Sequence, residues 1–118
     1  MATYRLIPAL KDYIWGGTKL KKYRKTDLDI ISESWELSFH EDGLTMIEKD
    51  GKILSLKEVV TKEDLGENVK KFTFFPVLIK LIDAKDNLSV QVHPSDDYAL
   101  KYENSYGKTE MWYVVDAE

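Results

Sequence analysis

The sequence of 118 residues contains no cysteine. This absence excludes a disulfide framework and a thiolate metal site, so any bound metal has to use nitrogen and oxygen ligands. Long apolar runs are absent too: residues 1–5 lack the apolar core of a secretory signal, and no run approaches the roughly 18 residues that span a bilayer. We therefore expect a cytoplasmic protein without a membrane partner.

The sequence also lacks a long block of one charge. It has 17 basic and 21 acidic residues, which give a formal net charge of −4. Because neither sign gathers into the patch that a nucleic acid or an anionic surface needs, we expect no nucleic-acid partner. Hydrophobic residues make up 43% of the chain, which at this length predicts one domain over residues 1–118 rather than two.

A mostly β fold is indicated by short segments in which apolar and polar residues alternate. Residues 34–40 predict a half-buried strand. Its apolar face consists of Trp35, Leu37 and Phe39. Its polar face consists of Glu36, Ser38 and His40. We favour a structural role for that polar face, because no metal-like spacing links it to other residues.

A β-hairpin and a short helix are predicted next. Asp50-Gly51 can adopt the positive φ angles of a two-residue turn, which predicts a hairpin over residues 45–54. Ser55 can cap a helix over about residues 55–61, because Glu58 is placed to reach back to the amide of the cap.

Helical structure is expected to resume beyond this first helix. Gly66 predicts a break before the stretch that ends at Lys71. Ser95, directly after Pro94, can cap a further helix through Tyr102.

The chain then closes on an apolar segment. Gly107 is expected to end the helical segment that follows Ser95. Residues 109–115 then predict a last strand, which no polar tail follows. We therefore expect that the chain is truncated before the fold is complete. We also expect it to self-associate through this C-terminal strand.

One lysine interrupts an apolar segment. Residues 74–82 predict a buried strand that includes Lys80. Burying an ammonium is costly unless it finds a partner or an anionic ligand, so Lys80 is a candidate binding residue. The alternative is an edge position with the ammonium in water.

Three polar residues suggest a metal site. Residues 87–94 alternate, so a strand there places Gln91 and His93 on one face, and Glu110 follows on the last strand. Amide oxygen, imidazole and carboxylate suit zinc or a similar divalent ion. By spacing alone, the alternative is that His93 only ends a strand before Pro94 and that Glu110 is solvated.

Four segments resemble the type I mannose-6-phosphate isomerases, in the short form of Gram-positive bacteria. The most specific is a Val-x-His-Pro motif followed by Gly-Lys-Thr-Glu-x-Trp. The matching segments, in the order of the family, are residues 10–17, 33–40, 76–84 with 88–94, and 107–113.

The resemblance implies an incomplete cupin-type jelly-roll and a zinc-dependent enzyme. It implies that His93 and Glu110 are zinc ligands with Gln91 as a further one, and that Lys80 lines a sugar-phosphate pocket. The implied reaction is the isomerisation of mannose 6-phosphate and fructose 6-phosphate through an enediol, a step of carbohydrate metabolism.

The family is about twice as long or longer, and its second cupin motif, with another histidine ligand and the catalytic arginine, has no counterpart in this sequence. Arg5 and Arg24 stand in no matching context. We therefore expect these residues alone to be inactive.

Two further interpretations compete with an isomerase. The first is a non-catalytic cupin-like binding or assembly module from a truncated gene. The second is a metal-independent cupin epimerase acting on sugar nucleotides, which needs a catalytic His-Asp pair that the sequence does not offer.

Overall fold

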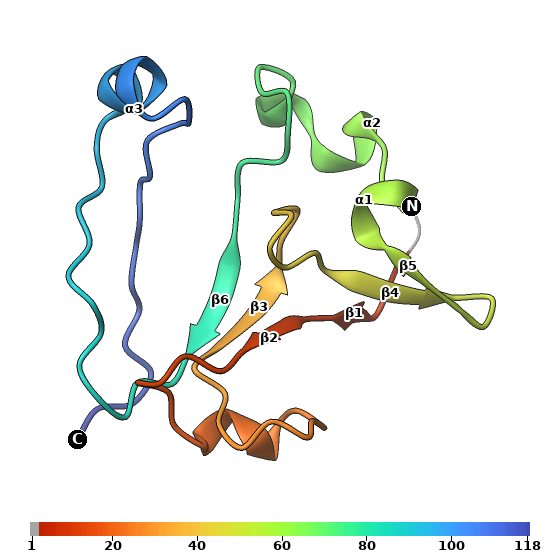
Figure 1. The fold of residues 1–118 in the computed structure, drawn as a ribbon. Helices are drawn as coiled ribbons and strands as arrows, with labels where there is room; N and C mark the ends of the chain where they lie inside the picture. Colours follow the sequence, from red (N-terminus) through yellow and green to blue (C-terminus); the bar gives the residue numbers. More distant parts are fainter. Residues whose placement is uncertain (1–2) are drawn as a thin grey trace. The chain divides into compact units, whose positions relative to one another are not determined.

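The computed structural model describes residues 3–118, which form two compact units divided after Leu88. The first unit contains every strand of the described chain, and the second, Ser89–Glu118, contains one helix between two extended segments (Figure 1). Within residues 3–118, no helix has the length and apolar character required to cross a membrane.

The first sheet of the larger unit has the order β1-β4-β5 and is antiparallel throughout. Its strands are β1 (Leu6–Ile7), β4 (Met46–Lys49) and β5 (Lys52–Ser55). Asp50 and Gly51 connect β4 to β5 with φ angles of 52° and 73°. The predicted hairpin is therefore confirmed, and its turn has the two positive φ angles that Asp-Gly accommodates.

The second sheet has the order β2-β3-β6 and is also antiparallel. Its strands are β2 (Ala9–Lys11), β3 (Glu33–Leu37) and β6 (Ile79–Ile82). β3 is central, and its first three residues are all buried although they point to alternating faces. The strand predicted over residues 34–40 exists with shifted bounds, and its first half is more buried than expected.

The strand predicted over residues 74–82 is shorter than its apolar run. Only Ile79–Ile82 forms β6, and Pro76, which has no N–H, cannot donate a hydrogen bond to a neighbouring strand. β6 is an edge strand, with Ile79 50% exposed and Leu81 40% exposed. The expectation of a buried strand is therefore wrong for these two side chains.

The predicted helix after the hairpin is confirmed as α1 (Leu56–Val59). Ser55 Oγ accepts from the Lys57 amide at 3.2 Å, and the Ser55 amide donates to Glu58 Oε2 at 2.9 Å. This reciprocal cap is the predicted one, and the helix ends earlier than residue 61 because Val60 is extended.

Three more short helices belong to the larger unit. They are the 3-10 helices η1 (Lys19–Lys22) and η2 (Glu67–Val69), and α2 (Lys62–Leu65). Gly66 separates α2 from η2 with a φ of 86°, as the predicted break required.

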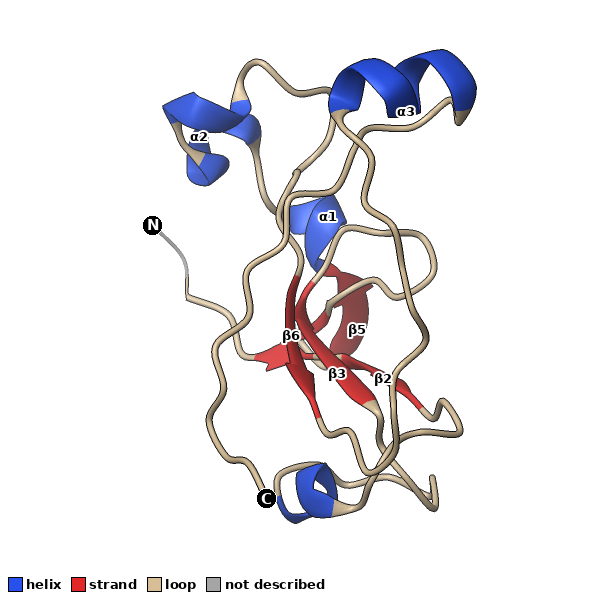
Figure 2. Cartoon of the chain, turned by 90° about the vertical axis from the view of Figure 1, so that its left-hand side faces the viewer, coloured by secondary structure: helices blue, strands red, loops and turns tan. Residues whose placement is uncertain are grey.

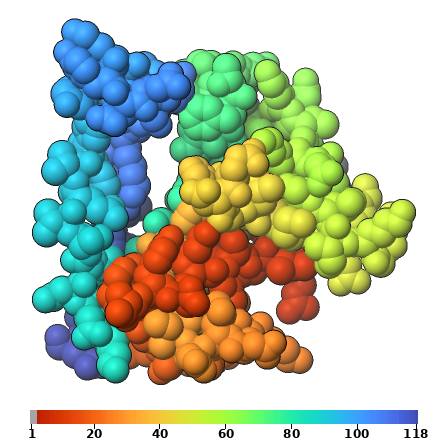
Figure 3. Space-filling view, viewed as in Figure 1, coloured from red at the N-terminus to blue at the C-terminus, as the bar shows by residue number. Residues whose placement is uncertain are grey.

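A small apolar core joins the elements of the larger unit. Its buried apolar members are Leu20, Ile31, Trp35, Ile47 and Leu56. Figure 3 shows the loop after β3, in yellow, lying against the N-terminal segment in red. At Gly43 in this loop an added Cβ would lie 2.7 Å from the Trp35 ring and 3.1 Å from Ala9, so the approach is close.

The second unit is built around α3 (Asp96–Tyr102), which Ser95 caps through the Tyr98 amide as predicted. Its flanking segments are drawn as loops in Figure 2, and within the described chain neither 87–94 nor 109–115 is a strand. The two predicted strands are therefore wrong as regular elements. A strand requires a hydrogen-bonded neighbour, and Val90 and Val92 are 98% and 87% exposed.

Candidate functional site

In the second unit, the chain that follows α3 returns close to the residues that precede α3. Gly107 donates its amide to Asp96 Oδ1 at 2.9 Å. A Cβ at Gly107 would lie 2.4 Å from the carbonyl oxygen of Pro94, so only glycine allows this approach. The contact closes the segment between residues 94 and 107 and fixes the separation of the residues on either side.

This closure brings two predicted metal ligands together. His93 Nε2 lies 2.7 Å from Glu110 Oε2, and the two residues are 17 positions apart in the sequence. Both side chains are partly shielded, with 28% and 23% exposure.

Glu110 is held by three donors. Burial acts to raise the pKa of its carboxyl group. Hydrogen bonds from His93, Lys108 and Trp112 have the larger, opposite effect and lower the pKa to about 2. Lys108 Nζ lies 3.1 Å from Glu110 Oε1. The group is therefore a carboxylate in neutral solution, which is the form that binds metal.

The donor chemistry of this pair fits a divalent metal ion in part. An imidazole nitrogen and a carboxylate oxygen are both ligands that zinc accepts. Metal binding would displace the His93–Glu110 hydrogen bond, and the Lys108 ammonium would oppose it. Gln91 is exposed, and residues 3–118 hold no cluster of three or more histidine, cysteine or acidic side chains suited to a metal. The role of Gln91 as a metal ligand stays a prediction.

Lys80 belongs to the other unit, where it has a carboxylate partner. Its Nζ lies 3.1 Å from both carboxylate oxygens of Glu33. The Lys80 side chain is 18% exposed and that of Glu33 is 8% exposed. Of the two interpretations of Lys80, the one that leaves its ammonium in water is therefore wrong. Its place in a substrate pocket stays a prediction.

Trp35 completes this group on one face of β3 and β6. Its Nε1 donates to Glu33 Oε2 at 2.6 Å, and Lys80 Nζ lies 5.4 Å from the centre of its ring. Trp35 is the cross-strand neighbour of Lys80. Glu33 had no predicted role, although its position two residues before Trp35 places both on the same face of a strand.

The opposite face of β3 carries a second polar cluster, of which the sequence pattern indicated only Glu36. Arg24 donates to Ser34 Oγ at 3.2 Å and forms an ion pair with Glu36. Ser34 also donates to Glu36, with 2.6 Å between the oxygens. His40, in contrast, accepts from the Asp42 amide and packs edge-on against Trp35, in keeping with the structural role favoured for it.

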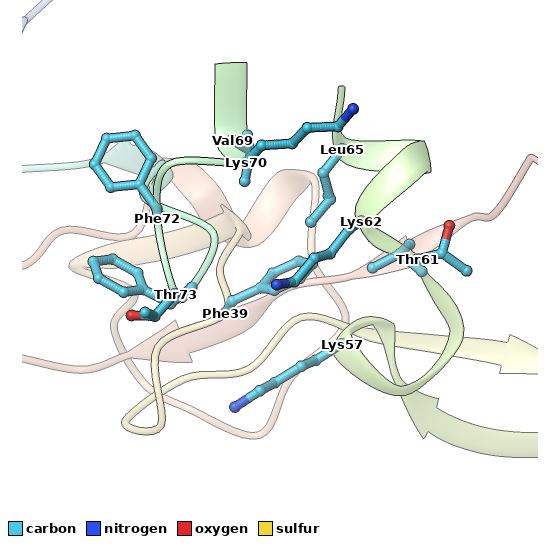
Figure 4. A pocket seen from close by; sticks show the side chains of 11 residues that line it. Phe39, Lys57, Thr61, Lys62, Leu65, Val69, Lys70, Phe72 and Thr73 are labelled. Atoms are coloured by element: carbon cyan, nitrogen blue, oxygen red, sulfur yellow. The ribbon is translucent and has the colours of Figure 1, made fainter. Parts of the chain in front are cut away.

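A groove of about 160 Å³ lies elsewhere in the larger unit, beside α1, α2 and η2 (Figure 4). Its walls combine apolar side chains with lysines. The residues that line it are Phe39, Lys57, Val60, Thr61, Lys62, Leu65, Val69, Lys70, Phe72, Thr73 and Phe74. Lys80 and its two partners are not among them.

Comparison with known proteins identifies the family. Residues 3–115 match the model of the phosphomannose isomerase type I catalytic domain, so the chain belongs to this family. A mannose-6-phosphate isomerase of Streptococcus mutans is 40% identical over 89% of the chain. The probable mannose-6-phosphate isomerase GmuF of Bacillus subtilis is 40% identical over 96%. The chain covers 34% and 37% of these relatives, about a third of their length.

A solved structure supports the same assignment. The crystal structure of the mannose 6-phosphate isomerase from Bacillus subtilis matches 98% of the chain and 38% of its own, with a TM-score of 0.82 and 32% identity. The predicted class, a mostly β cupin-type fold with short helices after Ser55 and after Pro94, is therefore confirmed. The family is a class of metalloenzymes, as the resemblance implied.

Proposed function

We propose that this chain contributes to an enzyme that isomerises mannose 6-phosphate and fructose 6-phosphate in the cytoplasm. The family match over residues 3–115 carries the proposal, because it includes both the His93 and the Glu110 segments. The isomerisation breaks the C2–H and O2–H bonds of the open-chain aldose and forms C1–H and O1–H bonds, through an enediol, so the enzyme has to hold both carbons near one proton-transfer group.

In this proposal zinc is the metal, and His93 and Glu110 hold it with Gln91 as a further ligand. When bound, the ion polarises the sugar oxygens as a Lewis acid. The His93–Glu110 contact of 2.7 Å supports a shared site. Lys80 binds the sugar-phosphate substrate. In support of this role, its ammonium is paired with Glu33 and its side chain is only 18% exposed.

We further propose that residues 1–118 alone do not catalyse the reaction. The relatives are about three times as long as the part matched here, and the catalytic arginine is expected outside these residues. The test is a coupled assay of mannose 6-phosphate conversion with zinc supplied. It compares residues 1–118 with the same residues joined to the remaining two thirds of the Bacillus subtilis relative. Activity only in the joined protein is expected, and equal rates in both contradict this placement.

The alternative function, a binding or assembly module, has one observation in its favour. Five apolar side chains of the second unit are 84% to 98% exposed. They are Val90, Val92, Met111, Tyr113 and Val115. We propose that this surface self-associates, because exposed extended apolar segments pair readily. Sedimentation of the V92K variant tests it: a smaller assembly than wild type is expected, and an unchanged mass contradicts self-association.

A further inference from the structure

We propose that Glu33 is a positioning residue for Lys80, and that it directs the ammonium toward a neutral sugar oxygen, a hydroxyl or carbonyl, rather than toward the phosphate. The naming of a sugar phosphate as the ligand rests on the proposed function. The orientation of Lys80 by Glu33 rests on the ion pair itself.

The ion pair between Glu33 and Lys80 is symmetric. Both oxygens of Glu33 lie 3.1 Å from Lys80 Nζ, so the ammonium is centred on the carboxylate. An ammonium has three N–H groups, and a carboxylate that faces it occupies two of them at most. At least one N–H therefore stays available for a ligand, and its direction is set by where Glu33 holds the nitrogen.

The Glu33 carboxylate is itself held by a hydrogen bond. Trp35 Nε1 donates to Glu33 Oε2 at 2.6 Å, and Trp35 is 7% exposed. The pairing of β3 with β6 places Trp35 directly opposite Lys80. The carboxylate therefore cannot rotate freely, and Lys80 lacks the conformational freedom of a surface lysine.

The charges of Glu33 and Lys80 decide which ligand suits the ammonium. The Glu33–Lys80 pair is neutral as a unit, and Glu33, at 8% exposure, is poorly screened by water. A phosphate dianion placed against Lys80 would also meet the negative charge of Glu33. A neutral hydroxyl or carbonyl oxygen accepts the remaining N–H without that repulsion. The pair thus favours a sugar oxygen as the ligand of Lys80.

The matched control is on the same strand. Glu36 is also a carboxylate of β3 paired with a cation, but it points to the opposite face, where it contacts Arg24 and Ser34. The E36Q variant removes one charge from β3 and leaves the surroundings of Lys80 intact. E33Q removes the charge beside Lys80 and keeps an oxygen for the Trp35 hydrogen bond.

The experiment measures reductive methylation of Lys80 by peptide mass spectrometry in the full-length protein. We expect E33Q to raise the rate of Lys80 methylation about tenfold and E36Q to change it by less than about twofold. The reason is that only Glu33 forms hydrogen bonds with the Lys80 ammonium. Mannose 6-phosphate should protect Lys80 in the wild-type protein, whereas inorganic phosphate at the same concentration should not. Equal rates in E33Q and wild type overturn the positioning role, and equal protection by inorganic phosphate overturns the sugar-oxygen assignment.

Steady-state kinetics separate positioning from a merely structural role. We expect E33Q to lower kcat on the order of 100-fold with KM changed less than threefold, because a misplaced group affects the transition state most. E33D, which keeps the charge on a shorter side chain, should recover part of kcat. Circular dichroism confirms that each variant is folded. The methylation rates do not depend on catalytic activity, so they test the positioning role by themselves. A failure of the proposed function would instead appear as a lack of isomerase activity in the wild-type enzyme.

Discussion

His93 and Glu110 face each other across a 2.7 Å contact, at the two ends of a segment that the hydrogen bond from Gly107 to Asp96 closes. The separation depends on Gly107, whose approach to Pro94 excludes any side chain. Two residues of the predicted metal site are therefore adjacent without regular strands to align them.

Substitution of His93 by alanine should abolish stoichiometric zinc in the purified protein. The imidazole is the neutral nitrogen ligand of the proposed site, and Glu110 alone binds zinc weakly. Inductively coupled plasma mass spectrometry measures the metal. The control is H40A, since His40 is the other histidine of the chain and contacts Asp42. Unchanged zinc in H93A would remove the site from consideration.

Loss of Lys80 should destabilise the larger unit. K80M leaves Glu33 buried without a cation, which costs about 3 kcal/mol of the free energy of unfolding. The double variant E33Q/K80M should cost less than K80M alone. Urea unfolding measures these values. K57M is the matched control, because the pair of Lys57 with Glu41 is exposed and screened by water, so its loss should cost much less. Equal losses in K57M and K80M would contradict the prediction.

Two glycines should differ sharply in their tolerance of alanine. At Gly16 an added Cβ lies 2.6 Å from the backbone of buried Ser32, so G16A requires backbone movement and should cost more than about 2 kcal/mol. At Gly51 nothing lies within 4 Å, and only the φ of 73° opposes a side chain. G51A should therefore cost about 1 kcal/mol. Thermal unfolding of both variants checks the order, and a larger loss in G51A would reverse it.

The cap of α2 should respond to acid through Asp64. Hydrogen bonds from the amide and then the hydroxyl of Thr61 lower the pKa of this carboxyl group below its ordinary value of 3.8. The carboxylate therefore stabilises the cap above pH 3.8, and this contribution is lost as the pH falls through the lower folded value. A carbon-detected NMR titration of Asp64 measures it, with D64N removing the pH response of the Thr61 amide. Titration at or above 3.8 would contradict the cap.

Local chemistry was readable from the sequence. The Asp50-Gly51 turn, the Ser55 and Ser95 caps and the break at Gly66 all occur where they were predicted. Each depends on a few adjacent residues whose backbone preferences and short-range hydrogen bonds do not require the remainder of the fold.

Pairing between distant segments was decided only by the tertiary structure. Residues 87–94 and 109–115 have the alternation of strands, yet neither segment pairs with a strand of a sheet in the described chain. The partner of Lys80 is 47 residues away in the sequence, and the register of β3 against β6 brings Glu33 and Trp35 to it. Alternation fixes which side chains share a face of a strand, but the neighbour across that face is set by which strands pair and in what register.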